Sequence, residues 1–146
     1  MSGEVIRRSA WWGTAAFSVT AVAAAAAPDT LAAPAFVVAV ALFLAGCAAF
    51  VAAYATGIRR SRREQISVAN LYFLTGDIAS AAVRRSLLGA LAVQVVVALA
   101  TAIARPSSSL AAGTLVPVYG LGLCGLWASL HGTFEPHPER DAGATG

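Results

Sequence analysis

Four apolar runs occupy most of this chain, and each is close to the length needed to cross a lipid bilayer. They cover residues 10–27, 34–57, 87–104 and 110–130. A transmembrane helix needs about 20 mostly apolar residues, because its backbone must span a hydrocarbon core of about 30 Å. Hydrophobic residues make up 58% of the chain and charged residues only 12%, against about a quarter charged in soluble domains. We therefore expect an all-α fold, a transmembrane four-helix bundle that forms a single integral membrane domain over residues 1–146.

Proline and glycine mark the expected ends of these helices. Between the first two runs, Asp29 stands between Pro28 and Pro34, which predicts a tight turn that ends one helix and starts the next. Pro106 and the serines after it predict the same between the last two runs, and Gly57 is expected to end the second span. Such short connections force antiparallel neighbours.

The placement of arginine predicts how the chain threads the membrane, since cytoplasmic loops and flanks retain positive charge. All ten basic residues are arginines, and only Arg105 lies between the third and fourth runs or between the first and second. The other nine are Arg7, Arg8, Arg59, Arg60, Arg62, Arg63, Arg84, Arg85 and Arg140. Trp11, Trp12 and Trp127 fall at the same ends, and tryptophan favours membrane interfaces. We expect a multi-pass protein of the cell inner (plasma) membrane with both termini in the cytoplasm.

The first run is the weakest of the four predicted spans. Besides alanines and tryptophans it has only Phe17, Val19 and Val22 as strongly apolar residues. Arg7 and Arg8, followed by a weakly apolar stretch that ends in alanines, also fit a cleaved secretory signal peptide. We favour an uncleaved span, because the paired tryptophans make a good interfacial anchor and the run is long for a signal peptide.

Small residues in the runs indicate how the helices pack, because helices in lipid associate where their backbones can approach closely. The predicted packing positions are Ser86, Ala90, Gln94, Ala98 and Ala102 in the third run, Ala45, Ala49 and Ala53 in the second, and Gly120, Gly122, Gly125 and Ser129 in the fourth. The Gln94 amide needs a partner in hydrocarbon. It either joins helices, which we favour, or lines a polar pathway. Pro117 should kink the fourth helix by removing a backbone hydrogen bond and crowding the carbonyl of Gly113.

The segment 58–86, called the hinge below, separates the second span from the third. Ser61 and Glu64 have the S-x-x-E spacing of a capping box, which predicts the start of a short cytoplasmic helix. Gly76 should break this helix, and Asp77 should cap the next one, which runs into the third span.

The hinge helix lacks a single apolar face, so it should be covered on more than one side. The cover is either the cytoplasmic ends of the spans or another protein. The expected contact residues, for a partner protein or for anionic lipid headgroups, are Arg59, Arg60, Arg62, Arg63, Leu71, Tyr72, Phe73, Arg84 and Arg85. Because the arginines stand at the ends of apolar runs, membrane lipid is a more natural counter-charge than nucleic acid.

The sequence offers no visible group for catalysis. All seven acids lie in loops, turns or tails, and neither a phosphate-binding loop nor a nucleophile motif occurs. His131 and His137 could bind a metal with Glu135 or Glu139, but their spacing fits a solvated tail (residues 131–146) better than a ligand set. Cys47 and Cys124 each lie in an apolar run and are expected to pack as small hydrophobic residues. We therefore expect neither an enzyme, a cofactor nor a metal site.

Three stretches carry a family resemblance: LYFL at Leu71–Leu74, the arginine-led run from Arg84 to Pro106, and the glycine-rich run from Gly113 to Gly132. In these the chain resembles small four-span integral membrane proteins of high-GC Gram-positive, actinobacterial-type bacteria. The resemblance covers about the last half of the chain. It implies a membrane location and a number of spans, and nothing about chemistry.

Two functions fit these features. The leading hypothesis is a non-enzymatic accessory or scaffold subunit that uses the hinge, from Arg59 to Arg85, to contact a partner protein or anionic lipid. The alternative is a small transporter or channel, acting as a homo-oligomer, with Gln94, Tyr119 and a kink at Pro117 near its pathway.

Overall fold

The computed structural model describes residues 1–106 and 109–136, and this part of the chain folds into helices with no β-strand. The elements are α1 (Gly3–Ala26), α2 (Pro28–Ser61), α3 (Val68–Phe73), α4 (Ala81–Ala104), the 3-10 helix η1 (Ser109–Leu115) and α5 (Pro117–His131). Within the described ranges, three helical stretches are long and apolar enough to cross a membrane: Pro28–Ser61, Ala81–Ala104 and Ala111–His131. This is the pattern of a multi-pass membrane protein. The first predicted span, which lies in α1 except for its last residue Ala27, is not among the three.

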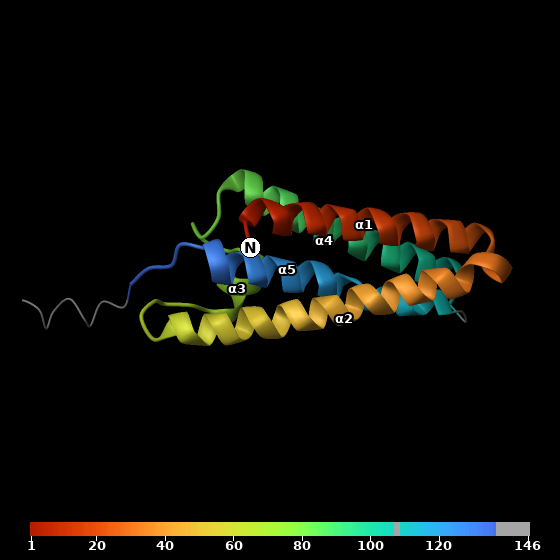
Figure 1. Cartoon of the computed structure of the whole chain (residues 1–146). Helices are drawn as coiled ribbons and strands as arrows, with labels where there is room; N and C mark the ends of the chain where they lie inside the picture. Colours follow the sequence, from red (N-terminus) through yellow and green to blue (C-terminus); the bar gives the residue numbers. More distant parts are fainter. Residues whose placement is uncertain (107–108, 137–146) are drawn as a thin grey trace, which may run out of the picture.

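The four long helices α1, α2, α4 and α5 lie side by side and alternate in direction along the chain (Figure 1). α5 is the most enclosed of them and packs against the other three and against α3. Small residues account for this position, since Gly120, Gly122, Gly125 and Ser129 are all buried on it. These are the packing residues that the sequence predicts for the fourth run.

The backbones of α2 and α5 approach most closely at two glycines. A methyl group on Gly46 would stand 2.5 Å from the backbone N and Cα of Tyr119, and one on Gly122 would collide with the carbonyl oxygen of Gly46. Glycine is therefore required at this crossing, where any side chain would force the helices apart.

The predicted packing faces are partly confirmed for both α4 and α2. Ala90, Gln94 and Ala98 are buried on α4, whereas Ser86 and Ala102 at the ends of the predicted row are half-buried. On α2 the buried residues are Ala35, Ala39, Gly46, Ala53 and Gly57, so the predicted row is correct at Ala53, half-buried at Ala49 and wrong at the exposed Ala45. The sequence rule of one small residue every four positions misses the alternation of three and four that keeps one helical face turned inward.

The prediction at Pro28 is partly confirmed, and those at Pro34 and Pro117 are wrong. One helix ends and the next begins close to Pro28, as predicted, but the break is the single residue Ala27, and α2 continues through Pro34. Pro28 occupies the first helical position, where its missing N–H costs nothing. Pro117 does not kink a continuous helix; it is the first residue of α5, after η1, and the Gly113 carbonyl accepts a hydrogen bond from the Val116 N–H (3.0 Å).

The hinge differs from the prediction in its helix boundaries. α2 runs past Gly57 to Ser61, and no capping box forms, because the Ser61 hydroxyl donates to the Ile58 carbonyl within α2. Other serines start the next helices. The hydroxyl of Ser67 accepts from the Asn70 N–H at the start of α3, and that of Ser80, rather than Asp77, accepts from the Val83 N–H at the start of α4.

The break between α3 and α4 lies close to the predicted glycine. Leu74, directly after α3, has a φ of 53°, and Gly76 has a φ of 77°. Both are in the left-handed region, which suits glycine and is unusual for leucine. The Leu74 side chain is completely buried, and this packing holds the strained residue in place.

Candidate functional site at the arginine-rich end

One end of the molecule gathers most of its charge. The start of α1, the end of α2, α3, the start of α4 and the end of α5 all lie there (Figure 1). They bring together eight arginines: Arg7, Arg8, Arg59, Arg60, Arg62, Arg63, Arg84 and Arg85. Arg105, after α4 at the opposite end, donates a hydrogen bond to the carbonyl of Ala25 in the last turn of α1 (3.1 Å). Arg140 lies outside the described residues.

The apolar residues of the hinge mostly face the protein's own helices. Leu71 and Tyr72 are 3% and 2% exposed. The Tyr72 ring stacks on Phe50 of α2, with ring centres 4.2 Å apart, and its hydroxyl donates to the Phe50 carbonyl (3.1 Å). Gly125 of α5 lies against the same ring. The helix ends thus provide the expected cover, and Leu71 and Tyr72 are not available to a partner; Phe73, 51% exposed, still is.

Burial also changes the acidity of this tyrosine. It raises the pKa of the Tyr72 phenol above its usual value, and nearby Tyr54 adds a smaller effect in the same direction. The phenol therefore stays protonated at neutral pH and acts as a hydrogen-bond donor.

Arg60 is used inside the structure. Its guanidinium donates to the carbonyl of Ser129 (3.0 Å) and to that of Gly132 (3.1 Å), at the end of α5. It also forms an ion pair with Glu64 (2.8 Å), and its carbon Cζ lies 5.0 Å from the centre of the Phe134 ring. A cation at a helix C-terminus satisfies carbonyls that have no partner in the helix, so Arg60 joins α2 to the end of α5.

The chain after α5 closes over the hinge. The Gln65 N–H donates to the Glu135 carbonyl (2.8 Å), and the Thr133 N–H donates to the Ile78 carbonyl (3.2 Å). Between the hinge and the chain after α5 lies a cavity of about 630 Å³. It is lined by Ser61, Glu64, Gln65, Ile66, Ser67, Asn70, Thr75, Gly76, Asp77, Ile78, Thr133, Phe134 and Glu135.

Four of the expected contact arginines remain on the surface. Arg59, Arg62, Arg63 and Arg85 are exposed, whereas Arg84 is half-buried and donates to the Gly76 carbonyl (3.4 Å). Among the described residues, Arg59, Arg63 and Arg85 take part in no ion pair. The hinge and the residues after α5 therefore form a folded, polar structure, called the cap below. Arginines lie on its outside, and carboxylates lie around its cavity.

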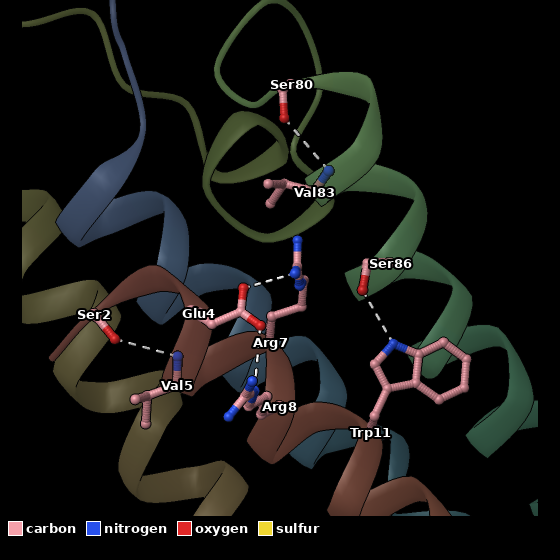
Figure 2. A network of polar contacts seen from close by, with 9 residues as sticks. All are labelled: Ser2, Glu4, Val5, Arg7, Arg8, Trp11, Ser80, Val83 and Ser86. Carbon is pink, nitrogen blue, oxygen red and sulfur yellow. Dashed lines mark hydrogen bonds and ion pairs between the residues drawn. The ribbon is translucent and has the colours of Figure 1, made fainter.

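A second polar network joins the start of α1 to the start of α4 (Figure 2). Glu4 forms ion pairs with Arg7 (2.6 Å) and Arg8 (3.3 Å), and the indole N–H of Trp11 donates to the Ser86 hydroxyl across the helix pair (3.0 Å). Trp12 is 76% exposed, whereas Trp127 is only 9% exposed and packs beside Gly3. Only two of the three tryptophans can therefore meet lipid to any extent.

The polar groups of the predicted pathway are occupied by helix contacts. Gln94 is completely buried; its amide N–H donates to the Thr14 hydroxyl of α1 (2.7 Å), and its carbonyl accepts from the Gly120 N–H of α5 (3.2 Å). The Tyr119 hydroxyl donates to the carbonyl of Ser9 (2.8 Å). One amide thus connects three helices, which favours the packing interpretation of Gln94.

Some of these partners could have been recognised in the sequence and others could not. Thr14 is a hydroxyl in an apolar run, a signal similar to that of Gln94, and serines 67 and 80 lie just before helical segments. That Arg60, and not a neighbouring arginine, bonds to the carbonyls at the end of α5 depends on where α5 ends, and the sequence around Arg60 does not indicate this. Within the described residues no group of three histidine, cysteine or acidic residues could hold a metal ion; His137 and Glu139 lie outside them.

Comparison with protein-family models, with curated proteins and with solved structures gave no match to this chain.

Proposed function

We propose that this protein is a non-enzymatic, four-span protein of the bacterial inner membrane, with both termini in the cytoplasm. It acts as an accessory or scaffold subunit that docks a partner protein on the cap at its arginine-rich end, through the hinge and the chain after α5. The surface arginines beside the cavity of the cap are the observation that carries this proposal.

The threading is supported by the distribution of charge between the two ends. Eight of the nine arginines in the described residues lie at one end, and the ninth, Arg105, is bonded to a helix carbonyl at the other. By the positive-inside tendency the arginine-rich end faces the cytoplasm. α1 belongs to the spans because it supplies seven buried residues and bonds to α4 and α5; its removal as a signal peptide would expose these contacts.

The chemistry of the cap favours a protein partner over a uniform layer of anionic headgroups. Arg59 and Arg63 lie on its surface, but Glu64, Asp77 and Glu135 line the cavity beside them. Surfaces of alternating sign suit a protein with complementary charges, and such charges act mainly on specificity and on the rate of encounter.

The test is charge reversal at the cap. The double variant Arg59→Glu and Arg63→Glu, and separately Phe73→Ser, should each reduce the amount of partner that is crosslinked in native membranes and co-purified in mild detergent. Asp29→Asn, an exposed change at the opposite end, serves as control. Unchanged co-purification by both cap variants would reject the docking proposal, and a tag after Gly146 that only an extracellular reagent can reach would reject the threading.

A further inference from the structure

A hollow on α1 lies outside the cap. It has a volume of about 370 Å³ and is lined by Arg7, Arg8, Trp11, Trp12 and Ala15. Along the helix, the two arginines come one turn before the two tryptophans, and the alanine follows about one turn after them. The bond from Trp11 to Ser86 of α4 fixes one of these tryptophans in position (Figure 2).

The exposed face of α1 continues this order toward the other end of the helix. Its exposed positions Arg8, Trp12, Ala15, Val19 and Val22 follow one another at spacings of four and three residues, so they share one face of the helix. From Trp12 to Val22 the stripe is about 15 Å long at 1.5 Å per residue, which is half of a hydrocarbon core of about 30 Å. Along this face a cation comes first, then an aromatic ring, then aliphatic surface. In one leaflet these match, in order, the phosphate of a phospholipid, the interfacial region and the acyl chain.

We infer that this face binds one anionic phospholipid, with its headgroup at Arg7 and Arg8 and an acyl chain along Trp12, Ala15, Val19 and Val22. The inference rests on α1 being a span, which is part of the proposed function, but it concerns a different surface from the partner-docking cap.

The charges of the site set the strength of its preference. Arg7 and Arg8 share the single carboxylate of Glu4, so the three residues together carry a net charge of +1. The ion pair uses Nε of Arg8, whose side chain is 75% exposed, so this guanidinium is accessible to a lipid headgroup. One basic charge near an anionic membrane surface contributes about 1 kcal/mol, which is about a fivefold preference for an anionic over a zwitterionic lipid.

The experiment measures quenching of tryptophan fluorescence by brominated acyl chains. The full-length protein is placed in vesicles of phosphatidylcholine with a minor fraction of phosphatidylglycerol, and one or the other lipid is brominated. The lipid-dependent signal comes from Trp11 and Trp12, since Trp127 is buried, and Trp12→Phe should remove much of it. We expect phosphatidylglycerol to associate about fivefold more strongly than phosphatidylcholine.

Two substitutions should shift this ratio in opposite directions. Arg8→Gln should lower it to about one, with Arg8→Lys restoring most of it, whereas Glu4→Gln should raise it about a further fivefold. Arg63→Gln, in the cap, should leave it unchanged. Circular dichroism of each variant checks that the helices form.

Each other result contradicts the inference. Equal quenching by the two lipids in the wild-type protein, or a ratio that does not respond to the Glu4 and Arg8 substitutions, would refute a selective site. A ratio that falls with Arg63→Gln would show that general surface charge, and not this hollow, selects the lipid. Absence of quenching by either lipid would mean that α1 does not contact lipid, which would also refute the four-span arrangement.

Discussion

Replacement of Gln94 by leucine tests whether one buried amide holds three helices together. Leucine is similar in size and removes both interhelical hydrogen bonds, to Thr14 and to Gly120. Such bonds contribute about 0.6 kcal/mol on average in membrane helices and at most about 1.7 kcal/mol. The bond to Thr14 is short and completely buried, so we assign it about 1 kcal/mol, and the longer one the average. Gln94→Leu should therefore lower the free energy of unfolding by about 1.6 kcal/mol, roughly a fifteenfold change in the unfolding equilibrium constant.

A double-mutant cycle with Thr14→Val isolates the shorter bond. The Thr14 hydroxyl donates to the Ala10 carbonyl of its own helix (2.7 Å), so removal of Gln94 leaves no unpaired donor on Thr14. Reversible unfolding of the four proteins in mixed micelles, followed by circular dichroism, should give a coupling energy of about 1 kcal/mol. A coupling below about 0.3 kcal/mol would show that the two side chains act independently and would refute the packing role of Gln94.

Further predictions use pairs of neighbouring or equivalent residues. Gly46→Ala should destabilise the fold by about 1–3 kcal/mol, because its methyl group would collide with the backbone of α5, whereas Gly89→Ala, with its nearest neighbour 3.9 Å away, should be neutral or stabilising in the same unfolding assay. Arg60→Gln should cost about 2 kcal/mol through the lost bonds to the end of α5; an equal effect of Arg59→Gln would contradict this. Because burial raises the pKa of Tyr72 above 10.0, its contribution to stability should be complete below pH 10.0 and decline above it, and Tyr72→Phe should remove that decline in unfolding curves measured across alkaline pH.

The two wrongly placed prolines show how far the sequence can predict this fold. The apolar runs locate the long helices, because length and hydrophobicity are properties of each run alone. Proline fixes its own φ, removes one N–H and crowds the carbonyl four residues earlier, and the fold accommodates this inside α2 at Pro34 and avoids it at Pro117, the first residue of α5. Which of these occurs depends on how the neighbouring helices pack, and that information is spread over residues far apart in the sequence.

Some features of the candidate site could likewise be predicted from the sequence, and others could not. Grouping of the arginines at one end follows from alternating helices and could be predicted from the order of the runs. The separate roles of Arg59 and Arg60 could not, because only Arg60 stands on the side of α2 that faces the end of α5. Tyr72 was expected to be covered either by the cytoplasmic ends of the spans or by another protein, and the sequence could not decide between them. The groups that receive its ring, Phe50 of α2 and Gly125 of α5, lie far from it in the sequence.

The single residue Ala27 between α1 and α2 has a consequence for how the chain enters a membrane. It leaves no slack between the two helices, so they can only move as one hairpin. α2 is long and apolar enough to cross a membrane by itself, whereas α1 is not among the helices that meet this condition. In the proposed four-span arrangement, the stronger helix would carry the weaker one across, and lengthening the link with a flexible glycine–serine insert would uncouple their insertion.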